Sequence, residues 1–384
     1  MDITATTGAT RAPSIPRGLI PAGSVLAAAL LSLVGTSWDL QWHTDVGPDT
    51  FFTLSHLFMY AGSAAAGLTS LVVVLRTTAQ RRSGAGIDPI VGGRPVGVLG
   101  RTFSAPVSYL VTGCGAASFL LYGLWDQWWH SLYGFDAEIS SPPHVGLLVS
   151  ISVTMVGATM VFATAREHRW GRIGMMIAAA TLLSFSVITA YALDGVVLGT
   201  VNAYLVANTF LCVVVVMTTA FTLRRPGGAV GTAAFVTLSQ VILWHLAPWA
   251  AEWYAGVEGL PMRDYLDPSP MHPSMLPMIL LAPAVLVELL RTRTPAWITG
   301  LAAGVVLGAW APIQAARLNA EPGPGLATIA GTALACAAIG ALAGYLALRF
   351  GDILWHLAPT AKRGARPGSA NADPAPTTVE TNNA

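Results

Sequence analysis

The sequence predicts an all-α, polytopic membrane protein: a bundle of about ten transmembrane helices with both termini in the cytoplasm. Hydrophobic residues make up 54% of the 384 residues and charged residues only 10%, whereas a soluble domain carries about a quarter charged residues. The apolar residues gather in runs that reach the roughly 20 residues a helix needs to cross a bilayer. The basic residues fall in alternate loops between these runs. Together these observations indicate repeated crossing of a lipid bilayer.

The apolar runs divide the chain into one transmembrane domain, residues 18–358, and two polar tails. The predicted spans cover residues 18–38, 52–75, 104–124, 144–165, 173–193, 198–223, 229–249, 273–290, 296–314 and 326–349. The tails are residues 1–17 and 359–384. The C-terminal tail is rich in Pro, Ala, Thr and Asn, a composition that predicts disorder.

The basic residues predict the orientation of the bundle. One set of loops and both tails hold nearly all Arg and Lys residues, and the alternate loops hold only Arg263 and Arg317. Cytoplasmic loops carry this excess, so we expect a multi-pass protein of the inner (plasma) membrane. The other, extracytoplasmic face is acidic and carries six of the eight histidines. No basic domain or stripe is present, which argues against nucleic-acid binding.

A motif on the histidine-rich face occurs twice. Segment 38–49 recurs as segment 125–136, one helical hairpin later, and six positions match in register: Trp, Asp, Trp, His, Gly and Asp. The matched residues are Trp38, Asp39, Trp42, His43, Gly47 and Asp49, and Trp125, Asp126, Trp129, His130, Gly134 and Asp136. Each copy ends an outward-running helix. A further histidine, His56 or His144, opens the return helix.

The spacing of these residues predicts two metal sites. Asp39 and His43 are four residues apart and share one face if the helix continues through them. His56 can meet them from the return helix. One carboxylate and two imidazoles suit copper, zinc or Fe(II) and leave positions open for a small ligand. The second copy repeats the set with Asp126, His130 and His144, and the two sets could form one dinuclear centre or two equivalent sites.

Further residues are predicted around these sites. The residues expected to orient the ligating rings are Gln41, Trp42, Asp49, Trp129 and Asp136. The motif hairpins are residues 18–76 and 104–166, and a fainter third copy covers 229–291. There Trp244 and His245 are expected to close one helix, and His272 to open the next. His245, Glu252 and His272 are therefore candidate ligands of an additional metal site.

The pattern Asp39-x3-His43-x12-His56 resembles the copper ligands of the C subunit of the particulate methane and ammonia monooxygenases. The resemblance covers one helical hairpin. It implies that these three residues bind copper and that the chemistry is copper-dependent O₂ activation on a small or apolar substrate. It also implies an electron donor and partner subunits. The second copy departs from the pattern by one extra residue between His130 and His144.

Three other functions compete with a copper oxidase or monooxygenase. A haem cytochrome is disfavoured, because Gly47-Pro48 and Pro142-Pro143 interrupt the helix between the paired histidines. A metal transporter or metal-delivery protein would need ionisable or sulfur ligands along the membrane path, and the span interiors are nearly free of them. A non-catalytic scaffold would use the Asp and His residues only for hydrogen bonds between helices.

Overall fold

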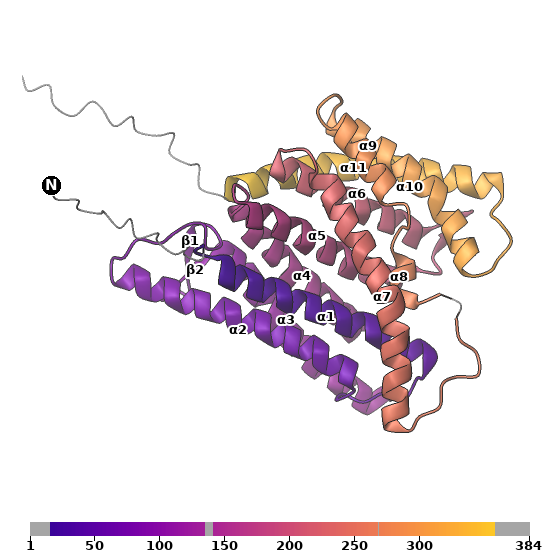
Figure 1. Ribbon diagram of the computed structural model, residues 1–384, viewed down its shortest axis with the longest axis horizontal. Helices are drawn as coiled ribbons and strands as arrows, with labels where there is room; N and C mark the ends of the chain where they lie inside the picture. The colour runs from indigo at the N-terminus through magenta and orange to yellow at the C-terminus, as the bar shows by residue number, and fades with distance from the viewer. Residues whose placement is uncertain (1–15, 135–140, 268, 358–384) are drawn as a thin grey trace, which may run out of the picture.

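The computed structural model describes residues 16–134, 141–267 and 269–357 and confirms the all-α prediction (Figure 1). Residues 1–15 and 358–384, which include nearly all of the two predicted tails, lie outside the described part, as do Asp136 and residue 268. Within it, nine helices are long and apolar enough to cross a membrane. They are α1 (Leu19–Asp45), α2 (Leu54–Arg82), α3 (Val107–Tyr133), α4 (Pro142–Thr164), α5 (Arg169–Ala190), α6 (Ala203–Leu223), α7 (Gly228–Glu258), α10 (Ala296–Leu318) and α11 (Leu326–Leu357).

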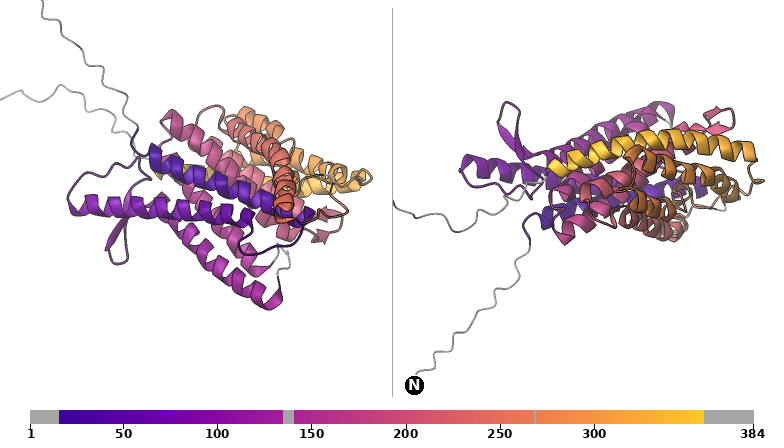
Figure 2. Two further views of the ribbon diagram at one scale, coloured as in Figure 1. Left: turned by 60° about the horizontal axis from the view of Figure 1, so that its bottom comes forward. Right: turned by 90° about the horizontal axis from the view of Figure 1, so that it is seen from above.

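The remaining elements are short. Two antiparallel β-hairpins interrupt the loops, and the first of them projects from the end of the bundle where α1 begins (Figure 2). The helices α8 and α9 occupy the place of the predicted eighth span. These elements are β1 (Pro95–Val98), β2 (Phe103–Pro106), the 3₁₀ turn η1 (Tyr191–Leu193), β3 (Val197–Leu198), β4 (Val201–Asn202), α8 (Met271–Met275) and α9 (Leu281–Leu290).

Glycines bring the helices of each motif hairpin close together. In α1–α2, a Cβ added at Gly62 would meet the Ser32 hydroxyl and lie 2.6 Å from the Ala28 carbonyl oxygen. In α3–α4, a Cβ at Gly157 would collide with the backbone and side chain of Thr112. Small residues allow such close backbone approach between membrane helices, where van der Waals packing drives association. The hairpins are therefore tightly packed supports for the motif at their ends.

The helices α5 and α6 form the centre of the bundle. Leu183, Phe185 and Ile188 of α5 and Met217 of α6 are fully buried in the main apolar cluster. The α1–α2 and α3–α4 hairpins pack on one side of this centre, and α10 and α11 pack on the other (Figure 1). The first residues of α1 and the last residues of α11 lie at the same end of the bundle (Figure 1). The motifs lie at the opposite end, where α1 and α3 finish.

The predicted eighth span, 273–290, is not one continuous helix. The chain leaves helical geometry at Leu276 and resumes it only at Leu281. Pro273 and Pro277 lack a backbone N–H, so they cannot complete the helical hydrogen-bond ladder. An interrupted backbone at membrane depth is tolerated where protein surrounds it, and Leu276 and Leu280 are fully buried.

Amide side chains from three long helices complete the hydrogen bonds of this break. The Gln240 amide of α7 donates to the carbonyl oxygens of Pro273 and Leu276, at 2.8 and 3.0 Å. The Asn208 amide of α6 donates to Met275, and the Gln314 amide of α10 donates to Ser274 and Leu276. These bonds replace the missing helical ones, because an unpaired carbonyl in an apolar interior would cost several kcal/mol.

Candidate metal centres

The Asp and His residues that begin each motif lie inside a helix, the condition that the sequence argument required. The helix α1 continues to Asp45 and α3 to Tyr133, so Asp39 and His43, like Asp126 and His130, lie one turn apart on the same helix face. The return helices α2 and α4 begin at Leu54 and Pro142 and supply the third residue of each set. The structure therefore brings together all six predicted ligands in two groups: Asp39, His43 and His56, and Asp126, His130 and His144.

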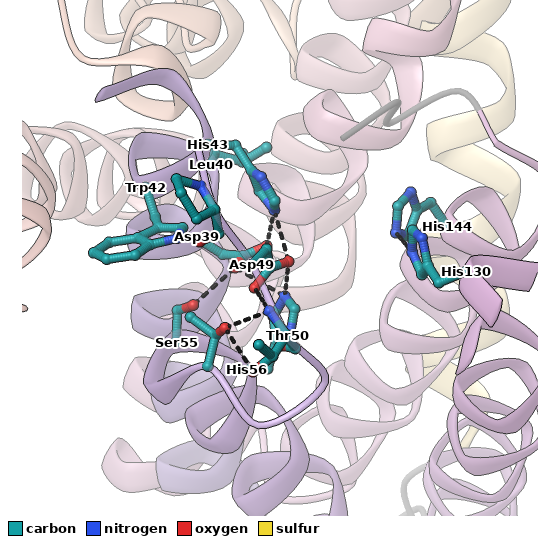
Figure 3. Close-up of polar contacts among 12 residues, drawn as sticks. Asp39, Leu40, Trp42, His43, Asp49, Thr50, Ser55, His56, His130 and His144 are labelled. Atoms are coloured by element: carbon teal, nitrogen blue, oxygen red, sulfur yellow. Dashed lines mark hydrogen bonds and ion pairs between the residues drawn. The ribbon is translucent and has the colours of Figure 1, made fainter. Parts of the chain in front are cut away.

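The first group contains a second carboxylate. The Nε2 atom of His56 lies 3.0 Å from Asp39 Oδ1, and His43 Nε2 lies 3.9 Å from Asp39 Oδ2. Asp49, from the loop between α1 and α2, reaches both rings: its Oδ2 atom is 3.2 Å from His43 Nε2 and 3.4 Å from His56 Nε2 (Figure 3). Asp49 was predicted only to orient the rings, and it instead shares the space between them with Asp39.

The second group has the donor spacing of a metal site. Asp126 Oδ1 lies 3.5 Å from His130 Nε2 and 3.3 Å from His144 Nε2, and the two Nε2 atoms are 3.4 Å apart. With metal–ligand bonds of about 2.1 Å and tetrahedral angles, two donor atoms are separated by about 3.4 Å. All three measured distances lie within about 0.1 Å of that separation. One ion placed between the three atoms would therefore contact them all.

Backbone carbonyls orient one ring in each group. His56 Nδ1 lies 3.0 Å from the Thr50 carbonyl oxygen, and His130 Nδ1 lies 2.8 Å from that of Gly134. A carbonyl oxygen only accepts, so each Nδ1 carries the proton and donates it. Metal-binding histidines are commonly held in this way. At 3.0 Å from Asp39 Oδ1, the Nε2 atom of His56 also donates a proton when no metal is present, and a metal ion bound between them would take the place of that proton.

The loop carboxylate of the first group is held ionised. Burial alone would raise the pKa of Asp49, but the hydrogen bond from His43 and the charge of His56 outweigh it, and the net pKa is lowered. Trp42 keeps the loop in place, because its indole N–H donates to the Pro48 carbonyl oxygen at 2.7 Å. Asp49 is therefore an anionic donor fixed against both imidazoles.

The two groups open onto one cavity of about 90 Å³. Asp39, His43 and His56 line one part of it, and Asp126 and His144 line another. Figure 3 shows the first group and the His130–His144 pair as two separate clusters of side chains. The rest of the wall is mostly apolar, and its residues include Leu40, Met59, Tyr60, Phe119, Leu147, Leu148, Ile151 and Ile188. The cavity has room for several waters or one small ligand.

Tyr60 stands between the groups. Its ring centroid is 6.1 Å from that of His56 and 6.1 Å from that of Phe119. Its phenol interacts electrostatically with Asp39, Asp49 and Asp126, which belong to both groups. The Asp126 carboxylate also interacts with His56 and Asp49 of the other group. The charged side chains of the two groups are therefore close enough to interact with one another.

The other residues predicted to orient the rings act less directly. The Gln41 amide donates to Asp45 at 2.8 Å and accepts the Met271 backbone N–H, so it joins α1 to α8. Trp42 acts through the Asp49 loop. Trp129 packs on Tyr133, with ring centroids 4.5 Å apart. Asp136 lies outside the described residues.

The third motif copy differs in structure from the other two. The helix α7 runs on through Pro248 to Glu258, so Trp244 and His245 do not close it as predicted. His245 and Glu252 are exposed, whereas His272 is fully buried and contacts the Ser184 carbonyl oxygen through Nε2 at 3.2 Å. Within the described residues these three side chains are not part of any metal-ligand group. The broken segment turns His272 inward while His245 and Glu252 are exposed, and the additional site there remains a prediction.

Several residues of the site were not foreseen. Ser55 donates its hydroxyl to Asp39 Oδ1 at 2.8 Å, and the Thr50 and Gly134 carbonyls hold the rings. The position of Ser55 directly before His56 was only a weak indication in the sequence that its hydroxyl belongs to the site. Nothing in the sequence indicated the contacts made by the two backbone carbonyls. Comparison of the chain with known protein families, with curated proteins and with solved structures finds no match.

Proposed function

We propose that this protein is a membrane metalloenzyme that binds copper in both Asp/His/His groups and acts as an oxidase or monooxygenase on a small or apolar substrate. The observation that carries the proposal is the convergence of two ligand groups on one small, largely apolar cavity. Membrane proteins rarely hold ionisable side chains near the bilayer without a function, and this chain lines one cavity with five Asp and His side chains. A scaffold would not need them to converge.

The donor chemistry fits copper. Imidazole nitrogen binds copper well, and zinc or iron would accept the same two imidazoles and carboxylate. Copper is favoured here because the sequence spacing of the first group resembles a copper site. Bound copper would supply the one-electron chemistry that O₂ requires.

The residues of this chain have definable roles in such an enzyme. The Thr50 and Gly134 carbonyls keep the Nε2 lone pairs of His56 and His130 directed at the metal positions. The carboxylates of Asp39, Asp49 and Asp126 offset the charge of a bound cation. The apolar wall limits water and admits a small apolar molecule.

Metal analysis with matched variants tests the metal sites. The purified protein, loaded with copper and freed of loose ions, should contain two copper ions per chain and give a copper EPR signal. His43→Ala and His130→Ala should each remove one ion. His245→Ala, an exposed histidine on α7, should remove none. Full copper content in the His43→Ala, His130→Ala double variant would refute the site assignment.

Oxygen uptake tests the reaction. With a chemical reductant, the copper-loaded protein should consume O₂, and the double variant should consume it at the rate of free copper controls. Stable copper binding without O₂ uptake would refute the oxidase proposal and favour metal delivery instead.

A further inference from the structure

The other end of the α1–α2 hairpin carries a large cleft. It has a volume of about 890 Å³ and is bounded by the first turns of α1, the last turns of α2 and the loop 86–91. Its lining includes Arg17 and Gly18, which directly precede α1, so the cleft lies at the end of the bundle where α1 begins. Along α1, Gly18 and Asp39 are about 30 Å apart at 1.5 Å per residue, which is the thickness of the hydrocarbon core. The cleft and the metal groups thus lie near opposite membrane interfaces.

Two exposed arginines line the cleft. Arg17 and Arg76 are exposed, and neither makes an ion pair or side-chain hydrogen bond with another residue of the described chain. Nearby arginines on α2 behave differently: Arg81 donates to the Ser104 hydroxyl and Arg82 to the Thr102 carbonyl. The acidic residue in the lining, Asp88, accepts the Ile90 backbone N–H. The cleft therefore has two guanidinium groups available for an anion.

Neutral donors surround these arginines. The hydroxyls of Ser24, Thr69 and Thr77 line the same cleft. The helix α1 starts there after Gly18, with no side chain capping its N-terminus. The Leu19 and Ala22 N–H groups already bond the Pro16 and Gly18 carbonyls and Pro21 has no N–H, so it is mainly the helix dipole that favours a negative charge at this position. This adds to the attraction of the arginines for an anionic group.

Apolar side chains continue the cleft toward the bilayer centre. Ile20, Leu68 and Val72 line it and are 65%, 63% and 46% exposed. Leu68 lies about two helical turns below Arg76 on α2, roughly 12 Å deeper. A free phosphate ion would use only the basic part of this lining. A phospholipid would use both parts.

We propose that this cleft binds one anionic phospholipid, with its phosphate between Arg17 and Arg76 and an acyl chain along Ile20, Leu68 and Val72. Basic pockets between membrane helices on the side with the arginine-rich loops recognise such headgroups. The lipid would join the start of α1 to the end of α2. This inference does not depend on the metal groups or on their chemistry.

Lipid binding to the purified protein tests the proposal. The protein in detergent is incubated with phosphatidylglycerol or phosphatidylcholine, and bound lipid is counted by native mass spectrometry. We expect one phosphatidylglycerol to be retained in preference to phosphatidylcholine. Each of Arg17→Gln and Arg76→Gln should weaken that binding about fivefold, as expected for one cationic side chain near an anionic headgroup. Inorganic phosphate should not displace the lipid.

Two further variants keep the test specific. Arg81→Gln with Arg82→Gln removes two positive charges from the same end of the hairpin, as the Arg17→Gln, Arg76→Gln double variant does, and should change lipid binding less than about twofold. Val72→Trp, which fills the apolar part without altering charge, should also reduce retention. Each variant is first shown to be monodisperse by size-exclusion chromatography. Equal retention of both lipids, displacement by phosphate, or unchanged binding by the Arg17→Gln, Arg76→Gln double variant would each overturn the proposal.

Discussion

The two ligand groups arise from the same motif but differ in charge. In the first group two carboxylates, Asp39 and Asp49, alternate with two imidazoles at 3.0 to 3.9 Å. In the described part of the second group a single carboxylate, Asp126, faces two imidazoles that are 3.4 Å apart. Without metal, the carboxylates of the first group can form ion pairs with its imidazoles when these are protonated. The second has less negative charge with which to do so.

Because of this difference, one group has the stronger charge attraction for a cation and the other has the more regular ligand geometry. The first group offers two negative charges to a cation, so we expect it to bind divalent metal more tightly. The second group has the more regular donor spacing, while each group has one ring held by a backbone carbonyl, His56 by Thr50 and His130 by Gly134. In the first group, His43 Nδ1 is buried and has no hydrogen-bond partner within the described residues. Two copies of one motif can thus hold metals of different charge or exchange rate.

The largest effects should follow loss of a histidine from the return helix. His56→Ala should lower the metal affinity of the first group more than about 100-fold, because it removes a ligand as well as its orienting contact. His144→Ala should do the same to the second group. Each variant should keep one copper ion per chain, measured by elemental analysis. Loss of both ions from either variant would show that the groups form one inseparable centre.

Carboxylate replacement should show the charge difference directly. Asp126→Asn removes the carboxylate that joins both imidazoles of the second group and should weaken metal binding there by about 10- to 100-fold. Asp49→Asn leaves Asp39 in place and should weaken the first group by about tenfold or less. Titration against a competing chromophoric chelator measures both. A larger loss of metal affinity for Asp49→Asn than for Asp126→Asn would contradict the proposed charge difference between the two groups.

The sequence predicted the six converging ligands because their positions depend on local geometry. A four-residue spacing puts Asp39 and His43 on one helix face, and a short loop returns His56 to the same end of the hairpin. The contact of Asp49 with both rings could not be predicted in this way. It depends on the path of the loop through Gly47 and Pro48 and on the hydrogen bond from Trp42. The register match between Asp49 and Asp136 was its only signal.

The sequence predicted the parts of the fold that depend on hydropathy alone. Nine of the predicted spans correspond to long apolar helices. The eighth does not, because hydropathy counts apolar residues and does not register a break at Pro273 and Pro277. The break also depends on Asn208, Gln240 and Gln314, which come from three helices distant in sequence. The same break also sets the buried position of His272 in the third motif copy, which hydropathy could not indicate.

Packing of the hairpins provides a smaller, separable effect. Gly157→Ala would place a methyl group against Thr112 and push α3 and α4 apart, at a cost of about 1–3 kcal/mol. Thermal unfolding in detergent should show a lower Tm, and the second group should lose metal affinity while the first keeps it. Gly123→Ala in the same hairpin is the control, because its nearest neighbour would be a Leu147 methyl group at 3.9 Å. Equal effects of the two variants would contradict this packing role.

The smallest effect should come from Ser55, which distinguishes the groups by one hydroxyl. Ser55 donates to Asp39 Oδ1, whereas the residue before His144 is Pro143, which has no hydroxyl. Ser55→Ala should therefore change metal affinity in the first group only, by about two- to tenfold, the range of one hydrogen bond. Chelator titration of the wild type and of Ser55→Ala, each in the His144→Ala background, isolates the first group. Ser55→Thr should retain the bond and most of the affinity. An unchanged affinity for Ser55→Ala would mean that Asp49 and the imidazoles alone fix Asp39.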